Sequence, residues 1–444
     1  KVLIIIVLAT VIVGYFISKT YWAADDFVYM QKFNGQSLSW NLITKSYDQH
    51  VVPMFITTWW VVDRIANGNY FIAASIMTAG FMILQYSFWR LLKLFSLSDM
   101  QRYFLLIFFV LSSTIIHNFI WWAAFLSSVV PLIFIINFFI YSIRYSRRYK
   151  KFDLVKSVFT FLISSLFFEK MALYSVVIFV FLLFFENYDL SIKTGIEKFK
   201  KLKFLWIFIA MSTVLSMALY AYSDAFNSSA SKPGIYQLLI YLKEVWLKYF
   251  VPQLFGFIYN RFDLFGSSFL TQFISIFFTC VLLLVIIKYK KFPIAVVIFF
   301  GAFFAINEAI VAFGRLTTNG YGLGGEVRYH LDSYLLLCIS IAIMGSYLNS
   351  KNVRYVNSIK LSASILLLIS VGFNLYAANI DLKGSVGFAS KKLYDNLADD
   401  SGEGIADTIL NERYIYFQQT PYNQLSNIVD TMNIDMNVID VGSK

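Results

Sequence analysis

The sequence predicts an all-α polytopic membrane protein, and three observations lead to this prediction. Of the 444 residues, 59% are hydrophobic and only 14% are charged, whereas a soluble domain is about 45–50% apolar and about 25% charged. Long apolar runs recur along most of the chain, and several approach the roughly 20 residues that cross a bilayer as a helix. Aromatic residues reach 19% of the chain. A soluble enzyme with a very apolar core cannot accommodate so many long apolar stretches.

About eleven apolar segments are long enough to cross a membrane or nearly so. Residues 2–18 are too long and too uniformly apolar for a signal-peptide core, so we expect a retained first helix. Segments 103–117 and 154–169 carry the weakest signal. The full set of segments is 2–18, 70–92, 103–117, 127–143, 154–169, 171–186, 204–222, 269–287, 293–312, 331–348 and 360–378.

The distribution of charge predicts the orientation of these segments. Cytoplasmic loops carry an excess of Lys and Arg, and a majority of the 37 basic residues fall on one side, including the runs 144–151, 193–203 and 288–291. We therefore expect the N-terminus inside and the C-terminus outside. The net charge of +11 then faces anionic lipid, and we expect no nucleic-acid partner. Most acidic residues and all three histidines fall on the predicted outer side.

Three outer connections are long. The first, residues 19–69, contains a predicted short amphipathic helix at 39–47 and an apolar helix at 54–66, both expected to lie in the interface plane. The second carries the apolar segment 235–250, which we expect to be interfacial or re-entrant because Lys and Glu interrupt it. The third, residues 313–330, is rich in glycine and is predicted to be a flexible outer loop.

The composition changes near residue 379, which divides the chain into two predicted parts. Residues 1–378 form the transmembrane domain, and the polar, acidic residues 379–444 form a small extracytoplasmic tail or appendage that could hold short strands at RYIYFQQ and NVID. The two cysteines, Cys280 and Cys338, fall in apolar runs and suggest neither a disulfide framework nor a zinc site.

Two neighbouring carboxylates, Asp25 and Asp26, follow the first apolar segment directly. Acidic groups at a membrane boundary are functional candidates because an ionised carboxylate there needs solvent or a partner. On position alone, two solvated loop acids explain the pair equally well. The same loop carries His50 between Asp48 and Pro53, where a satisfied interfacial histidine is the competing interpretation.

Further charged groups are predicted at the same face. Glu169 and Lys170 interrupt an apolar stretch and could be a neutralised structural pair. The second group lies in the third outer loop and at the start of the tenth segment, where a wet loop with an interfacial tyrosine is the alternative. Its members are Arg315, Glu326, Arg328, Tyr329, His330 and Asp332.

One reaction class unites these residues, namely sugar transfer from a lipid phosphate. The leaving phosphate needs fixed cations, for which Arg offers a planar fork and Lys a point charge, and the acceptor hydroxyl needs a carboxylate to take its proton. A second carboxylate could orient the base or hold a divalent cation such as Mg²⁺ or Mn²⁺; no cofactor is certain. The hypothesis assigns Asp25 or Asp26 as the base, Lys170, Arg328 and Arg315 to the donor phosphate, and His50, Glu169, Tyr329, His330 and Glu326 to substrate binding.

The arrangement resembles the GT-C superfamily of integral-membrane glycosyltransferases. The stretch AADDF at 23–27 matches the acidic motif that follows the first helix of that family, and FFEKMAL at 167–173 resembles its Lys-Glu pair in reversed order. The stretch DQHVVPMF at 48–55 with VVDRIANGNYF at 61–71 resembles a motif of bacterial members. The similarity covers residues 1–380 as an architecture. It implies that a first-loop aspartate is the catalytic base and that donors are polyprenyl-phosphate sugars.

The sequence therefore suggests an inverting glycosyltransferase in a bacterial plasma (inner) membrane. It would move a sugar from an undecaprenyl-phosphate donor to a cell-envelope glycan or lipid acceptor at the extracytoplasmic face. A transporter or flippase of lipid-linked saccharides is one alternative, which predicts ionisable residues near the bilayer midplane. A polymerase or ligase of such saccharides is another, which would depend on outer-loop arginines.

Overall fold

The computed structural model describes residues 1–23, 25–33, 35–45, 50–222, 232–256, 272–280, 283, 291–351, 369–380 and 382. Within these ranges the chain forms helices and no strand, which confirms the predicted all-α class. Nearly all of the predicted C-terminal tail, with its two predicted strands, lies outside the described residues, as do Asp48 and about half of each of the segments 269–287 and 360–378.

Five helical stretches of the described chain are long and apolar enough to cross a membrane, or six if one bent pair counts as a single span. The bent pair joins α6 (Asp99–Val110) to α7 (Ser113–Phe119) at an angle of 49°. The five stretches are Tyr70–Leu92, Trp122–Arg148, Lys203–Ala221, Phe292–Thr317 and Val327–Ser350. They confirm membrane-protein character, while the count of eleven spans stays a prediction.

These stretches contain most of the long helices. They comprise α5 (Tyr70–Leu92), α8 (Trp122–Ala124) with η1 (Phe125–Val129) and α9 (Val130–Arg148), α13 (Lys203–Tyr222), α17 (Phe292–Asn319), and η8 (Val327–His330) with α18 (Leu331–Ser350).

The shorter apolar helices match other predicted segments. Helix α1 (Val2–Ser18) coincides with the first of them, and α10 (Lys151–Phe167) with the segment at 154–169. The segment at 171–186 is broken into three pieces: a 3₁₀ helix, η2 (Glu169–Leu173), then α11 (Tyr174–Val180), then a π-helical turn, η3 (Phe181–Phe185). The break follows Phe168, whose backbone is extended with φ −158° and ψ 117°.

The surface of the bundle is apolar where the long helices face outward. Helix α1 exposes Leu3, Ile4 and Val11, and α13 exposes Met211 and Val214, each by more than half of its surface. In water such a continuous apolar surface would be unfavourable, whereas lipid chains solvate it. This exposure explains why hydropathy is high on every side of these helices rather than on one stripe.

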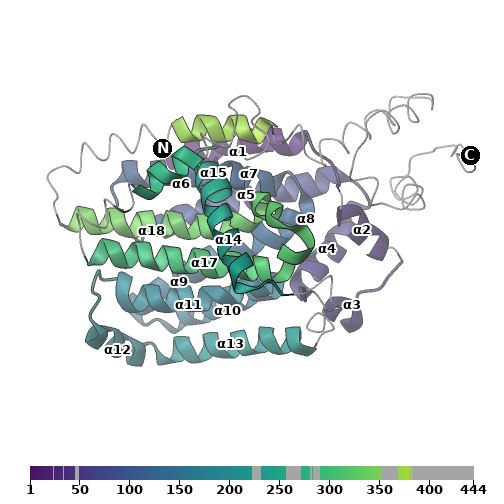
Figure 1. The fold of residues 1–444 in the computed structure, drawn as a ribbon. Helices are drawn as coiled ribbons and strands as arrows, with labels where there is room; N and C mark the ends of the chain where they lie inside the picture. Colours follow the sequence, from purple (N-terminus) through teal and green to yellow (C-terminus); the bar gives the residue numbers. More distant parts are fainter. Residues whose placement is uncertain are drawn as a thin grey trace, which may run out of the picture.

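The bundle has two ends that differ in their elements (Figure 1). The long helices run side by side between α12 (Ile192–Lys201) at one end and the short helices α2 (Asp25–Phe33), α3 (Trp40–Thr44) and α4 (Pro53–Ala66) at the other. We call these the α12 end and the α4 end. At the α12 end, Arg147 in the last turn of α9 is 3.1 Å from Glu186, which follows η3. Glu186 also accepts from Lys198 of α12 at 3.4 Å, so successive helix ends meet there.

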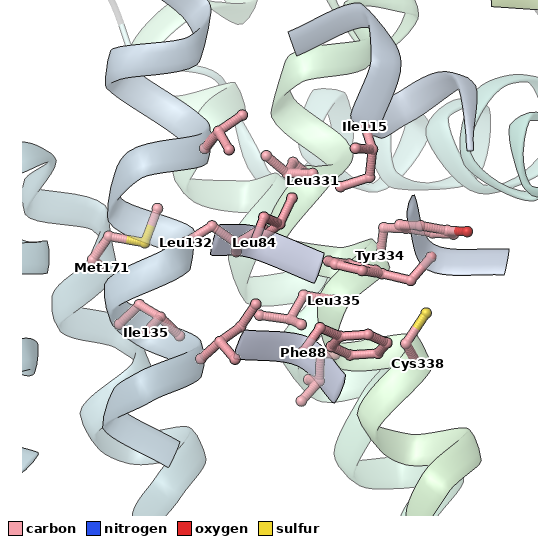
Figure 2. Close-up of a cluster of buried hydrophobic side chains, with 14 of the residues drawn as sticks. Leu84, Phe88, Ile115, Leu132, Ile135, Met171, Leu331, Tyr334, Leu335 and Cys338 are labelled. Atoms are coloured by element: carbon pink, nitrogen blue, oxygen red, sulfur yellow. The ribbon is translucent and has the colours of Figure 1, made fainter. Parts of the chain in front are cut away.

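The core forms where side chains of several helices interdigitate at the centre of the bundle (Figure 2). Leu84 and Phe88 of α5 lie against Leu132 of α9 and Leu335 of α18, and all are fully buried. The Tyr334 hydroxyl donates to the Phe108 carbonyl at 2.6 Å. This bond satisfies the only polar atom of a ring that is otherwise surrounded by hydrocarbon.

Small hydroxyl residues join α9, α10 and α13 closely. Ser142 and Ser157 hydrogen-bond to each other at 2.6 Å, and Ser164 donates to the Pro131 carbonyl at 2.9 Å. Small residues let helix backbones approach, and hydroxyl bonds between helices add to the packing where no hydrophobic effect operates.

The described parts of the three long connections that were predicted to lie outside are more ordered than sequence alone predicted. Helices α3 and α4 confirm the predicted helices at 39–47 and 54–66. The segment at 235–250 is helical, and residues 313–330, predicted to be a flexible loop, hold the last turns of α17 and two 3₁₀ helices. The remaining elements are α14 (Ile235–Glu244), the π-helical η5 (Val245–Phe250), α15 (Val251–Leu254), and the 3₁₀ helix η7 (Tyr321–Gly325).

Helix α5 crosses η1 at a glycine, and this crossing generates a testable prediction. A Cβ atom on Gly80 would lie 2.6 Å from the ring of the buried Phe125, whereas a Cβ on Gly301 of α17 would meet nothing within 4 Å. We expect Gly80→Leu to destabilise the detergent-purified protein by about 1–3 kcal/mol through overpacking and Gly301→Leu not to. Thermal unfolding measures both, and equal melting temperatures for the two variants would contradict this packing.

Candidate functional site

The α4 end carries a set of polar and charged side chains that the fold brings together from distant parts of the sequence. They come from the start of α2, from His50 just before α4, from the η2 break between α10 and α11, from α17, and from the run that begins at Glu326 and continues through η8 into α18. The set contains all ten residues that the sequence singled out.

Asp26 is held by the backbone. Its side chain is fully buried, and its two oxygens accept the backbone N–H groups of Ala23 at 2.9 Å and of Ala123 at 3.0 Å. Burial raises the pKa of the Asp26 carboxyl well above its usual range, and the neighbouring charge of Asp25 acts in the same direction against the two backbone donors. Asp26 therefore ties the entry of α2 to α8, while Asp25 is half-buried and nearer the surface.

Three buried tryptophans support this junction. Trp22, Trp59 and Trp122 come from the segment before α2, from α4 and from α8, and their ring centroids lie 5.8, 6.2 and 6.4 Å apart. The Trp22 indole also donates to the Gly68 carbonyl at 2.9 Å. Large rings packed edge to face restrict the orientation of the elements that carry them, so the backbone around Asp25 has a fixed position.

Two arginines meet at one tyrosine. The Arg328 guanidinium lies 5.1 Å from the Tyr329 ring centroid and 4.9 Å from that of Trp121, and the Arg315 guanidinium lies 6.0 Å from the same Tyr329 ring. Asp25 is among the carboxylates whose charge acts on Arg328. Glu326, which is exposed, approaches Arg328 at 3.9 Å. The arrangement gathers two planar cations and one half-buried carboxylate at the same place.

Glu169 and Lys170 do not pair with each other. Glu169 Oε1 lies 2.5 Å from His50 Nδ1, and the imidazole ring lies 5.1 Å from the ring of Phe168. Lys170 instead forms an ion pair with Asp332 at 2.5 Å. The 3₁₀ geometry of η2 turns the two adjacent side chains toward different partners, so each contacts a distant residue without the local pair that the sequence suggested.

The Lys170–Asp332 ion pair is buried and has a third member. The Tyr174 hydroxyl donates to the Asp332 carbonyl at 3.2 Å and lies 3.4 Å from its Oδ1 atom. A buried ion pair is stable only when its remaining lone pairs and protons are also satisfied. Of the three cations assigned to a donor phosphate, Lys170 is thus already neutralised, whereas the two arginines stack on aromatic rings.

The sequence analysis missed a buried acid at this end. Glu308 of α17 is fully buried, and its Oε1 atom lies 3.3 Å from His330 Nδ1 and accepts from Asn307 at 3.0 Å and from Ser333 at 3.3 Å. His330 Nε2 donates to the Gly324 carbonyl at 2.7 Å. The sequence did contain a signal for this acid, namely the Asn-Glu pair inside an otherwise apolar segment. An ionisable residue in such a segment is a functional candidate by default.

A hollow opens beside this end, between α1 and α5. Its volume is about 820 Å³. Asn67 and Asn69 line it near the α4 end, and Ala74, Ala79 and Met82 line it further along α5. The hollow therefore has a polar mouth and an apolar length, which suits an amphiphilic molecule better than a small polar one.

The described part of the chain contains no group of three or more His, Cys, Asp or Glu side chains placed to hold a metal ion. The chain was also compared with protein-family models, with curated proteins and with solved structures, and no match was found in any of the three.

The contacts of Asp26 predict a pH-dependent effect on stability. In Asp26→Asn, one backbone donor would face an amide N–H group, and we expect a loss of about 1–3 kcal/mol of unfolding free energy. The folded state raises the Asp26 pKa, so folding takes up a proton in the pH range between the unfolded and the folded pKa. The stability that the protonated Asp26 contributes is therefore present below about pH 4 and is lost as the pH rises toward the pKa of Asp26 in the folded state.

The measurement is thermal unfolding against pH for the wild type, Asp26→Asn and the half-buried control Asp25→Asn. The difference between wild type and Asp26→Asn should shrink as the pH rises from about 4. A constant difference, or an equal loss in Asp25→Asn, would contradict the role given to the Asp26 carboxyl.

Proposed function

We propose that this protein is an integral-membrane glycosyltransferase of GT-C type, which moves a sugar from a polyprenyl-phosphate donor to a cell-envelope glycan or lipid. The observation that carries the proposal is the meeting of Arg328 and Arg315 at the Tyr329 ring, with the charge of Asp25 acting on Arg328. A proton acceptor and two planar cations at one place are what transfer from a sugar phosphate requires.

The chemistry assigns a role to each group. Asp25 takes the proton of the acceptor hydroxyl as its oxygen bonds to the anomeric carbon. The bond between that carbon and the phosphate oxygen breaks, and the phosphate leaves with the electron pair. Arg328 and Arg315 hold the phosphate through charge-assisted hydrogen bonds, which strengthen as negative charge develops. Attack from the side opposite the phosphate inverts the configuration of the sugar.

Two further observations support the proposal. The hollow between α1 and α5 gives the polyprenyl chain an apolar path beside the α4 end. The α12 end carries Arg147, Arg148 and the lysines of α12, which favours that end as cytoplasmic. The α4 end would then face the extracytoplasmic side of a bacterial plasma membrane, where lipid-linked sugars reach envelope acceptors.

One observation favours transport of a lipid-linked saccharide as a second candidate. Glu308 and His330 are buried within membrane-type helices, and transporters place ionisable residues there. A polymerase or ligase of lipid-linked saccharides would also use Arg315 and Arg328. The half-buried carboxylate beside the arginines is what favours a transferase over both alternatives.

Removing the proposed base gives the direct test. We expect Asp25→Asn to lower the turnover of sugar transfer at least about 100-fold, because a positioned base contributes roughly that much. The assay follows a labelled sugar from a polyprenyl-phosphate donor in detergent. Full activity in Asp25→Asn would contradict the assignment. If the wild type transfers no sugar but carries lipid-linked saccharide across vesicles, the second candidate replaces the first.

The arginines provide an independent test. Arg328→Lys keeps the charge but loses the planar fork, so we expect kcat/KM for the donor to fall by about tenfold to a hundredfold. The exposed Lys45, which follows α3, gives the matched control: Lys45→Ala should leave kcat/KM unchanged. Equal kinetics in Arg328→Lys and the wild type would remove Arg328 from the donor site.

A further inference from the structure

A second hollow lies at the α12 end, on the opposite side of the bundle from the site described above. Its volume is about 570 Å³. Three elements line it: the connection between η3 and α12 through Tyr188, the start of α17 through Lys291 and Phe292, and the end of α18 through Tyr347 and Lys351. Nothing in the proposed transfer reaction uses this place.

The floor of the hollow is aromatic and closely packed. The rings of Phe292 and Tyr347 stack with centroids 4.5 Å apart and an interplanar angle of 22°. Tyr188 meets Phe292 edge-on at 5.6 Å. Lys351 Nζ lies 6.0 Å from the Tyr347 centroid, so the stack gives this lysine a fixed surface to lie against.

The two lysines are exposed, and within the described residues neither has a carboxylate partner. The neighbouring acids are already engaged: Glu186 lies between Arg147 and Lys198. Asp189 accepts the Ser191 backbone N–H at 2.9 Å. Among the described residues, the hollow therefore presents two lysines without an ion-pair partner, which favours an anion as its occupant.

The backbone is strained at two of the lining residues. Tyr188 has φ 56° and Lys291 has φ 28°, and they are two of only four non-glycine residues with positive φ in the described chain. Side chains with a Cβ rarely adopt this region, and such conformations gather at functional sites. The strain turns both residues toward a common hollow instead of letting the helices end independently.

We propose that this hollow binds the phosphate headgroup of an anionic phospholipid. Lys291 and Lys351 hold the phosphate, and the aromatic floor contacts the glycerol region. A lipid is favoured over a free phosphate ion because α17 and α18 continue from the hollow with exposed apolar residues, Ile298 and Ile341, along which acyl chains can lie. Basic pockets between membrane helices on the cytoplasmic side are known to take such headgroups.

The test measures lipid binding to the purified full-length protein by native mass spectrometry, with phosphatidylglycerol and phosphatidylcholine titrated in detergent. We expect the double variant Lys291→Ala/Lys351→Ala to bind phosphatidylglycerol roughly thirtyfold more weakly than the wild type. The control Lys200→Ala/Lys201→Ala removes the same charge from exposed positions of α12 and should bind as the wild type does.

A rescue variant separates charge from folding. Lys291→Arg/Lys351→Arg should restore binding, because it keeps both charges in place. Three outcomes would overturn the proposal: equal losses in the two alanine double variants, equal affinity for phosphatidylcholine, or displacement of the lipid by millimolar inorganic phosphate, which would indicate a site for the free ion.

Discussion

The ion pair between Lys170 and Asp332 is the interaction on which the α4 end depends. An unpaired charge inside an apolar bundle is strongly unfavourable, and removing one partner of a buried pair leaves that cost uncompensated. The pair joins the broken segment at η2 to the start of α18. Once Asp332 is fixed there, the helical geometry of η8 and α18 sets the positions of Arg328 and His330. The break at η2 places Glu169 against His50.

The neighbouring groups divide into those whose contacts hold the end together and those to which we propose a role in sugar transfer. Both carboxylate oxygens of Asp26 accept hydrogen bonds from backbone N–H groups. The three tryptophans around it exclude water. Asp25, one residue earlier, keeps partial exposure and shares its surroundings with Arg328. The two adjacent carboxylates thus differ in their surroundings. The backbone N–H groups around Asp26 enclose its side chain, whereas the side chain of Asp25 stays partly exposed.

Composition and hydropathy were sufficient to predict the all-α class and the positions of the long apolar helices among the described residues. Helix α1 is bounded by Lys1 and Lys19, and α5 begins at the Asn69 cap, so local signals fixed their limits. The partners of the charged residues were not predictable, because they depend on contacts between distant segments. His50 and Glu169 are 119 residues apart. The helix break after Phe168 was predictable, because Glu169 and Lys170 interrupt the apolar stretch and separate the predicted segments 154–169 and 171–186. Glu308 was overlooked in a segment that otherwise satisfies every criterion for a lipid-spanning helix.

The π-helical turns constrain the chain in another way. Such a turn holds one residue more than an α turn. Deleting one residue from Phe181–Phe185 would therefore leave an ordinary α turn, whereas deleting one from α11 would rotate the chain beyond it by about 100° and carry Glu186 away from Arg147 and Lys198. The π-helical turns are consequently the places in these helices where the loss of a single residue least disturbs the contacts of the chain that follows.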